Sequence, residues 1–265
     1  MIKLSDDVFL LDIPIFEPKY DLSKNYNYSS NKGKKNLKEI LLKTSDDYCM
    51  YCYSKVLVDN KLSAHLEHSI EKNNSDKLKN CNVNISIACM KCNLSFKKVG
   101  EEKRKLKDCE VRLFEKNCIC KSTCKKPCHV YEKLKDIYLK KEDAQIILQP
   151  FGVVNKFTDN TYKLQYNLLE QEFIVSEEYE YTDYERNFIN KHIIRFNLND
   201  AEYRTKEVIK VCEDVIDYKQ IPKKKRYNNL VADLFIDRLN SMNIKTAIKM
   251  CENIIIYSSI KFEDA

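Results

Sequence analysis

The sequence of 265 residues has very little glycine and no tryptophan. Its three glycines, Gly33, Gly100 and Gly152, stand apart, so the sequence has neither a G-x-G-x-x-G turn nor a Walker A loop to bind nucleotide phosphates. No apolar run approaches the roughly 20 residues that span a bilayer, and the N-terminal segment lacks the basic and apolar regions of a signal peptide. We therefore expect a cytoplasmic protein with no membrane partner and no nucleotide-binding motif of its own.

What the sequence does have is cysteine, twelve residues in all, and most of them are clustered. Two C-x2-C pairs, Cys49 with Cys52 and Cys89 with Cys92, are separated by 36 residues. Disulfides are rare in a reducing compartment, where paired cysteines are more typical of metal sites. Four thiolates suit tetrahedral Zn²⁺. We expect these cysteines to hold a structural zinc that contributes to folding, rather than to be four unrelated buried thiols.

A second cysteine group follows the first one and contains five members: Cys109, Cys118, Cys120, Cys124 and Cys128. The last four are candidate ligands of a second structural zinc. A reactive thiol cluster and unligated cysteines remain as alternatives, because the spacing does not decide which residues bind. The isolated residues are expected to be small buried hydrophobic side chains; they are Cys81, Cys212 and Cys251.

Charge is unevenly distributed along the chain. The overall net charge is +6, but residues 95–141 carry fifteen basic and seven acidic side chains, and residues 142–200 carry five and eleven. The basic segment predicts an anion-binding surface, with a solvated helix face as the alternative. The candidates for contact with nucleic-acid phosphate are Lys97, Lys98, Lys103 and Arg104.

Hydrophobic periodicity predicts several helices and a few short strands. The expected helices are 36–43, 84–99, 101–115, 132–139, 184–194, 201–218 and 229–257. The expected strands are 55–59 and 62–68, which form a hairpin, and a strand pair within 162–175. The fold class is therefore α+β and mainly helical. We expect a first region at 1–141, which holds a compact core at 48–98 and a cysteine-rich basic extension, and a mainly helical second region at 142–265.

Residues suited to phosphodiester hydrolysis lie around the cysteine pairs. Glu67 and His68 end a predicted strand, Asn84 precedes the second pair, and Asn93 follows it directly. Hydrolysis needs a base to activate water and a hard cation to stabilise the developing charge. A histidine titrates in the right range for a base, and carboxylate and amide oxygens are ligands that Mg²⁺ accepts.

Some of these residues have rivals in the sequence. Asn84 could instead cap the helix predicted to begin there, and Asn82 is a weaker substitute for it. His65 is either a second active-site group or an ordinary strand residue, and we favour the latter. Glu71 is an alternative to Glu67 as a metal ligand.

Spacing, order and residue type together resemble the HNH nuclease family. The pattern is C-x2-C, then E-H, then N-x4-C-x2-C-N-x3-K-K, over about residues 48–98. The family has a ββα-metal fold that a four-cysteine zinc braces in many members. The resemblance implies that His68 is the general base, that Asn84 orients the histidine or its loop, and that Asn93 binds a catalytic Mg²⁺ or Mn²⁺. It also implies that Glu67 joins the metal shell and that Lys97 and Lys98 meet phosphate.

Within this family, C-M-Y-C, L-E-H and N-I-S-I-A-C-M-K-C-N resemble the HNH components of anti-phage systems of the Septu type and their retron-associated relatives. Ile147–Phe151 and Ile193–Asn199 resemble downstream segments of the same proteins. Ser69 replaces the usual aromatic residue after the histidine, and the proline that commonly follows is absent.

This resemblance implies an endonuclease that acts on nucleic acid, with DNA as the first expectation and RNA, including tRNA, as the second. It also implies a partner ATPase of the ABC/SMC type, with residues 142–265 as the docking region. The alternative is a non-catalytic zinc-dependent nucleic-acid-binding or adaptor subunit. In that case Glu67, His68 and Asn93 would be dispensable.

Overall fold

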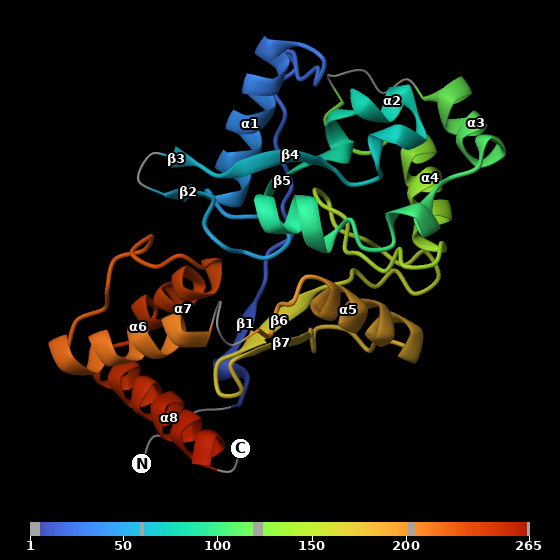
Figure 1. Ribbon diagram of the computed structural model, residues 1–265. Coiled ribbons are helices and arrows are strands. Elements are labelled where there is room, and N and C mark those ends of the chain that lie inside the picture. Colours follow the sequence, from blue (N-terminus) through green and yellow to red (C-terminus); the bar gives the residue numbers. More distant parts are fainter. Residues whose placement is uncertain (1–5, 59–60, 119–123, 201–204, 264–265) are drawn as a thin grey trace. The chain divides into compact units, whose positions relative to one another are not determined.

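The computed structural model describes residues 6–58, 61–118, 124–200 and 205–263, and these fall into two compact units (Figure 1). The cysteine unit consists of Ile15–Tyr162 and Tyr181–Phe196. The terminal unit consists of Met1–Pro14, Lys163–Glu180 and Asn197–Ala265. The division does not follow the expected boundary at 141/142, because the N-terminal strand pairs with a strand that lies more than 150 residues further along the chain.

Helix α1, Asn31–Ser45, opens the regular structure of the cysteine unit and contains the helix expected at 36–43. Ser30 caps its N-terminus, because the side-chain oxygen accepts a hydrogen bond from the Gly33 N–H. The helix ends at Asp46, which has a left-handed conformation. Leu37 and Leu41 are fully buried, and this face packs against the hairpin that follows.

That hairpin consists of β4, Ala64–His68, and β5, Ile85–Cys89, which pair antiparallel so that His68 lies opposite Ile85. The helix expected over 84–99 is therefore wrong in its first half. Residues 85–88 are all buried, Ser86 included, so burial does not alternate along the stretch, and such a short covered stretch suits a strand as well as a helix. Helical structure begins only at Met90 and continues as the π-helical segment Cys92–Phe96.

The other expected strands of this unit are shorter than predicted. Strand β2, Leu57–Val58, pairs with β3, Lys61–Leu62, and the loop residues between them lie outside the described part of the chain. The helix expected over 101–115 divides into a 3₁₀ turn, Glu101–Arg104, and α3, Asp108–Asn117.

Three further α-helices belong to the cysteine unit: α2, Asp76–Lys79; α4, His129–Leu139; and α5, Asp183–Arg195. Helices α3 and α4 pack together, with the rings of Phe114 and Tyr131 6.4 Å apart. Helix α5 begins with a capping box, in which Thr182 and Glu185 each bond the other's backbone N–H.

The terminal unit contains a three-stranded antiparallel sheet in the order β1, Leu10–Asp12; β6, Leu164–Asn167; β7, Glu172–Val175. This confirms the strand pair expected in 162–175. The unit also contains α6, Thr205–Tyr218; α7, Leu230–Asn240; and α8, Ile244–Glu263. The single helix expected over 229–257 is interrupted, since Asn243 accepts a hydrogen bond from the Thr246 N–H and starts a new helix. Helix α8 packs on α6 (Figure 1).

The fold is thus a mixture of helices and small sheets. Cys81, Cys212 and Cys251 are all fully buried, which confirms the expectation that they are core residues. Among the described residues, no helix combines the length and the apolar character that crossing a membrane requires.

Candidate zinc centre and active-site cleft

The two C-x2-C pairs meet in the cysteine unit. The sulfur atoms of Cys49, Cys52, Cys89 and Cys92 all lie within 4.8 Å of one another. Those of Cys52 and Cys89 are 3.7 Å apart, and a tetrahedral zinc with Zn–S bonds of about 2.3 Å places its sulfurs about 3.8 Å apart. The four side chains are buried or nearly so. This group can hold one Zn²⁺ as expected.

Local backbone geometry brings each pair into position. The first pair lies in a turn after α1, where the Tyr53 N–H bonds the Cys49 carbonyl at 2.9 Å and Tyr53 has a positive φ of 64°. In the second pair, the Cys92 N–H points at the Cys89 sulfur, 3.4 Å away. The Met50 N–H also bonds the Ile87 carbonyl at 3.0 Å, which joins the first pair to β5.

The four thiols do not share one direction of pKa shift, since that of Cys89 is lowered by its hydrogen bond with Cys49. Burial raises the pKa of Cys49 well above its ordinary value, so the thiol is protonated when no metal neutralises it. A bound zinc would replace the thiol protons with its own charge and couple its binding free energy to folding. Because the ligands come from segments on either side of β4, the metal would fix the position of that strand.

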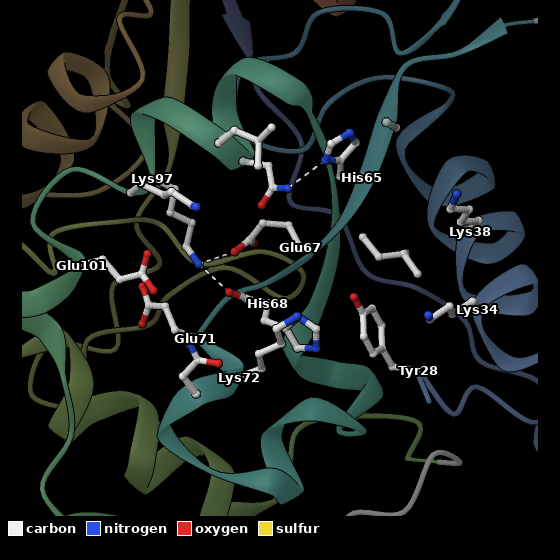
Figure 2. Close-up of a pocket in the computed structure, with 16 residues that line it drawn as sticks. Tyr28, Lys34, Lys38, His65, Glu67, His68, Glu71, Lys72, Lys97 and Glu101 are labelled. Carbon is white, nitrogen blue, oxygen red and sulfur yellow. Dashed lines mark hydrogen bonds and ion pairs between the residues drawn. The ribbon is translucent and has the colours of Figure 1, made fainter. Parts of the chain in front are cut away.

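A cleft with a volume of about 500 Å³ lies over β4 and the π-helical segment (Figure 2). Five lysines line it: Lys34, Lys38, Lys72, Lys97 and Lys98. Three glutamates also line it: Glu67, Glu71 and Glu101. The expected catalytic residues His68, Glu67 and Asn93 are among the lining residues, so the structure brings them to one cavity.

His68 ends β4 and has a side chain that is 7% exposed. Its Nε2 lies 3.1 Å from the Lys79 carbonyl oxygen, which only accepts, so Nε2 carries a proton and Nδ1 has a free lone pair. Burial lowers the pKa of His68 below its ordinary value of 6.5. The ring packs edge-on against Tyr28, with centroids 4.6 Å apart. His68 is therefore neutral at pH 7 and suited to accept a proton.

Asn84 holds the loop that follows His68. Its Oδ1 accepts a hydrogen bond from the Ile70 N–H at 2.8 Å, and its Nδ2 donates to the Ile70 carbonyl at 2.9 Å. The Tyr131 hydroxyl donates to the same Oδ1 at 2.9 Å. The helix-capping interpretation is wrong, because a strand rather than a helix follows. Asn82 is not a substitute, since its side chain bonds the Cys124 carbonyl instead of this loop.

Asn93 and His65 form a pair in the cleft. The Asn93 Nδ2 lies 3.0 Å from His65 Nδ1 (Figure 2). His65 pairs with Ala88 in the strand register and also lines the cleft. Sequence reasoning favoured a strand role alone, and the structure shows that the residue belongs to the site as well.

Glu67 is bonded through both carboxylate oxygens. Oε1 pairs with the Lys97 ammonium (Figure 2). Oε2 accepts hydrogen bonds from the Tyr51 hydroxyl at 2.8 Å and the Ser86 hydroxyl at 3.0 Å. The side chain is buried. With Lys97 in contact and Asn93 paired to His65, these residues do not fit a divalent ion as they stand.

Two of the four expected phosphate-binding residues are wrong. Lys97 is 4% exposed and ion-paired to Glu67. Arg104 is fully buried, and its guanidinium bonds Glu71 at 2.9 Å and the hydroxyl of Tyr138 at 2.9 Å. Both are structural cations, because a buried, fully bonded side chain cannot meet an incoming phosphate.

The other two expected residues differ in their surroundings. Lys98 is exposed and lines the cleft. Lys103 is also exposed but bonds Glu142 at 2.6 Å, and this contact raises its pKa. Of the four expected residues, only Lys98 is both exposed and part of the cleft lining.

The sequence did not predict that α1 contributes lysines to the cleft. Lys34 and Lys38 lie four residues apart, the spacing that places two side chains on one face of a helix. The ammonium groups of Lys34 and Lys72 lie 4.9 and 5.6 Å from the Tyr28 ring centroid. The i, i+4 lysine spacing was the available signal, but nothing in the sequence showed that α1 lies beside the hairpin.

The second cysteine group is described only in part. Cys120 lies outside the described residues, so the expected second zinc site cannot be assembled from the structure. Cys118 is buried, Cys124 and Cys128 are half-buried, and Cys109 is exposed.

No family model matches this chain, and comparisons with curated proteins and with solved structures give no match either.

Proposed function

We propose that the cysteine unit is an HNH-type endonuclease that hydrolyses phosphodiester bonds of nucleic acid. One observation carries the proposal: a buried histidine with a lowered pKa and a free Nδ1 lone pair stands in a lysine-lined cleft. The order of elements supports it, since a hairpin with the histidine at the end of its first strand leads into a helical segment that starts at the cysteine site. The HNH resemblance has the same order.

The chemistry uses the chain's own groups. His68 accepts a proton from a water molecule, whose oxygen attacks phosphorus, and the bond to the leaving oxygen breaks as that oxygen takes a proton from solvent. Lys34, Lys38, Lys72 and Lys98 supply positive charge for the phosphate. Asn84 is a positioning residue, because it holds the loop after His68 through Ile70.

The resemblance also assigns Mg²⁺ or Mn²⁺ to Glu67 and Asn93. These two residues line the cleft, but each is bonded within the protein. A divalent ion would supply further stabilisation of the transition-state charge if it were bound. Zinc is the cofactor that the geometry of the chain supports directly.

DNA is the substrate we propose first, and RNA, including tRNA, is the second candidate. The cleft lysines meet phosphate, which both nucleic acids share, and phosphate contacts carry no sequence information. We also propose that the chain works in an anti-phage complex with an ATPase of the ABC/SMC type. The resemblance supports this partner, and co-purification with the products of neighbouring genes tests it.

Cleavage of labelled DNA duplexes, single strands and tRNA tests the activity, both with the chain alone and with its co-purified partner. We expect the wild-type chain to cleave and His68→Ala to lose at least 100-fold in rate, in line with the loss of a general base. His129→Ala is the matched control, because His129 is exposed on α4 and does not line the cleft. Equal cleavage by wild type and His68→Ala would contradict the proposal.

The same assay distinguishes the nuclease from the alternative function. A non-catalytic zinc-dependent binding or adaptor subunit would bind nucleic acid without cleaving any of these substrates, with the partner present. His68→Ala would then bind as tightly as the wild type.

A further inference from the structure

A buried ion pair stands at the position where the HNH resemblance expects a metal ion. The Lys97 ammonium contacts Glu67 Oε1 and also donates a hydrogen bond to the His68 carbonyl oxygen. Both side chains of the pair are 5% exposed. The negative charge of Glu67 is therefore neutralised by a group of the chain itself.

The backbone of Lys97 is held from both directions. Its N–H bonds the Cys92 carbonyl at 3.0 Å, next to the zinc site. Its carbonyl accepts a hydrogen bond from the buried Arg104 guanidinium at 2.6 Å. Arg104 also bonds the Val99 carbonyl at 2.7 Å, two residues further along. The backbone of Lys97 is thus fixed by the fold, and its side chain is buried as well.

Two further lone pairs of Glu67 are also engaged. Tyr51 and Ser86 both donate to Oε2, so the carboxylate has four bonding partners at most and three of them are already present. A divalent cation at this carboxylate would lie beside an ammonium group in a buried site, where like charges repel strongly because water does not screen them.

We propose that the Lys97 ammonium is the resident cation of this cleft and takes the place of a divalent ion at Glu67. The role of Lys97 in catalysis rests on the proposed nuclease function. The prediction that Glu67 binds no divalent ion in the wild type does not depend on it. Glu67 then holds Lys97 against the His68 carbonyl and so positions the histidine. Hydrolysis by the wild-type chain accordingly needs no divalent ion at Glu67.

Removing the charge of Lys97 should turn Glu67 into a metal ligand. Lys97→Met keeps an unbranched side chain of similar length but leaves a buried carboxylate without a counter-charge, and such a group recruits a cation. Mn²⁺ is the probe, because it binds soft thiolate sites weakly and does not displace zinc from the four cysteines.

The experiment titrates Mn²⁺ into the zinc-loaded full chain and measures free Mn²⁺ by electron paramagnetic resonance. We expect no site dependent on Glu67 in the wild type, and one Mn²⁺ per chain bound at least tenfold more tightly by Lys97→Met. Adding Glu67→Gln to that variant should abolish the new site. Lys98→Met is the matched control, because Lys98 lines the same cleft without contacting Glu67, and it should gain no site.

Tight Mn²⁺ binding by the wild type that Glu67→Gln abolishes would overturn the proposal, and this comparison decides the matter even where Lys97→Met fails to fold. Folding of each variant is checked by its zinc content and circular dichroism. Cleavage by the wild type should persist within twofold in buffer freed of divalent ions, with zinc retained in the protein. A chain that never cleaves nucleic acid would defeat the nuclease function and leave the Mn²⁺ result unaffected.

Discussion

Removal of the Tyr51 hydroxyl tests how the cysteine site supports the cleft. Tyr51 lies between the first two cysteines, its hydroxyl donates to Glu67 Oε2 at 2.8 Å, and its ring stacks on Phe196 at 5.0 Å. Tyr51→Phe removes the hydroxyl and keeps the ring in place. Ser86 remains as the only other hydroxyl donor to that oxygen among the described residues. The substitution therefore removes one short, buried hydrogen bond to a charged acceptor, together with the longer contacts of this hydroxyl with Ser86 and Ser69 at 3.4 and 3.5 Å.

The expected size follows from the charge of the acceptor. Hydrogen bonds to charged groups contribute about 1.5–3 kcal/mol, and those between neutral groups about 0.5–1.5 kcal/mol. Tyr131→Phe is the matched control, since that fully buried hydroxyl donates to the neutral amide oxygen of Asn84 at 2.9 Å. We expect Tyr51→Phe to lower the free energy of unfolding by about 2 kcal/mol and Tyr131→Phe by about 1 kcal/mol.

Urea unfolding of the zinc-loaded chain at pH 7 measures both changes, provided the dependence on urea concentration stays the same for all three proteins. Burial raises the pKa of both tyrosines, so each hydroxyl is a neutral donor at that pH. A cost for Tyr51→Phe equal to or below that of Tyr131→Phe would refute the view that Glu67 is an ionised, buried acceptor.

Three further predictions concern metal, pH and charge. Cys89→Ser should reduce the zinc content below one per chain and lower the melting temperature, as metal analysis and calorimetry would show; full zinc occupancy would argue against the four-cysteine site. Burial lowers the pKa of His192 to about 3. As the pH falls, the unfolded chain therefore takes up a proton on this histidine before the folded chain does. The contribution of neutral His192 to the free energy of unfolding is complete above pH 6.5 and is lost as the pH falls towards 3. The loss is on the order of 5 kcal/mol. Acid unfolding of His192→Gln should lack this pH dependence. Lys38→Ala should weaken nucleic-acid binding and reduce the slope of log affinity against log salt concentration by the amount expected for about one phosphate contact. Lys35 is exposed and lies outside the cleft, so Lys35→Ala should change neither.

Much of the site was predictable because cysteine chemistry leaves a strong local pattern. The C-x2-C spacing identified four ligands without knowledge of the fold, and the structure brings their sulfur atoms together. Helix α1 and the strand pair β6–β7 were predicted because their apolar positions repeat with the period of each element. Strand β5 was missed, since a strand covered on both faces has no alternation to detect.

The errors at basic residues have a different cause. Lys97, Lys98, Lys103 and Arg104 form one basic stretch in the sequence, yet two of them are buried and two are exposed. Formal charge is a property of the residue, whereas burial depends on which helix or loop packs over it. Sequence alone therefore assigned one role to four residues that the fold separates.

By itself, the sequence determined the four cysteines of the candidate zinc site, the histidine at a strand end and the absence of a phosphate-binding glycine loop, because each depends on residue type and short-range spacing. Tertiary structure decided that Lys97 neutralises Glu67, that His65 pairs with Asn93, and that α1 supplies lysines to the cleft. The first two contacts join residues 30 and 28 positions apart, and no local pattern records which of many polar side chains will meet once the chain has folded.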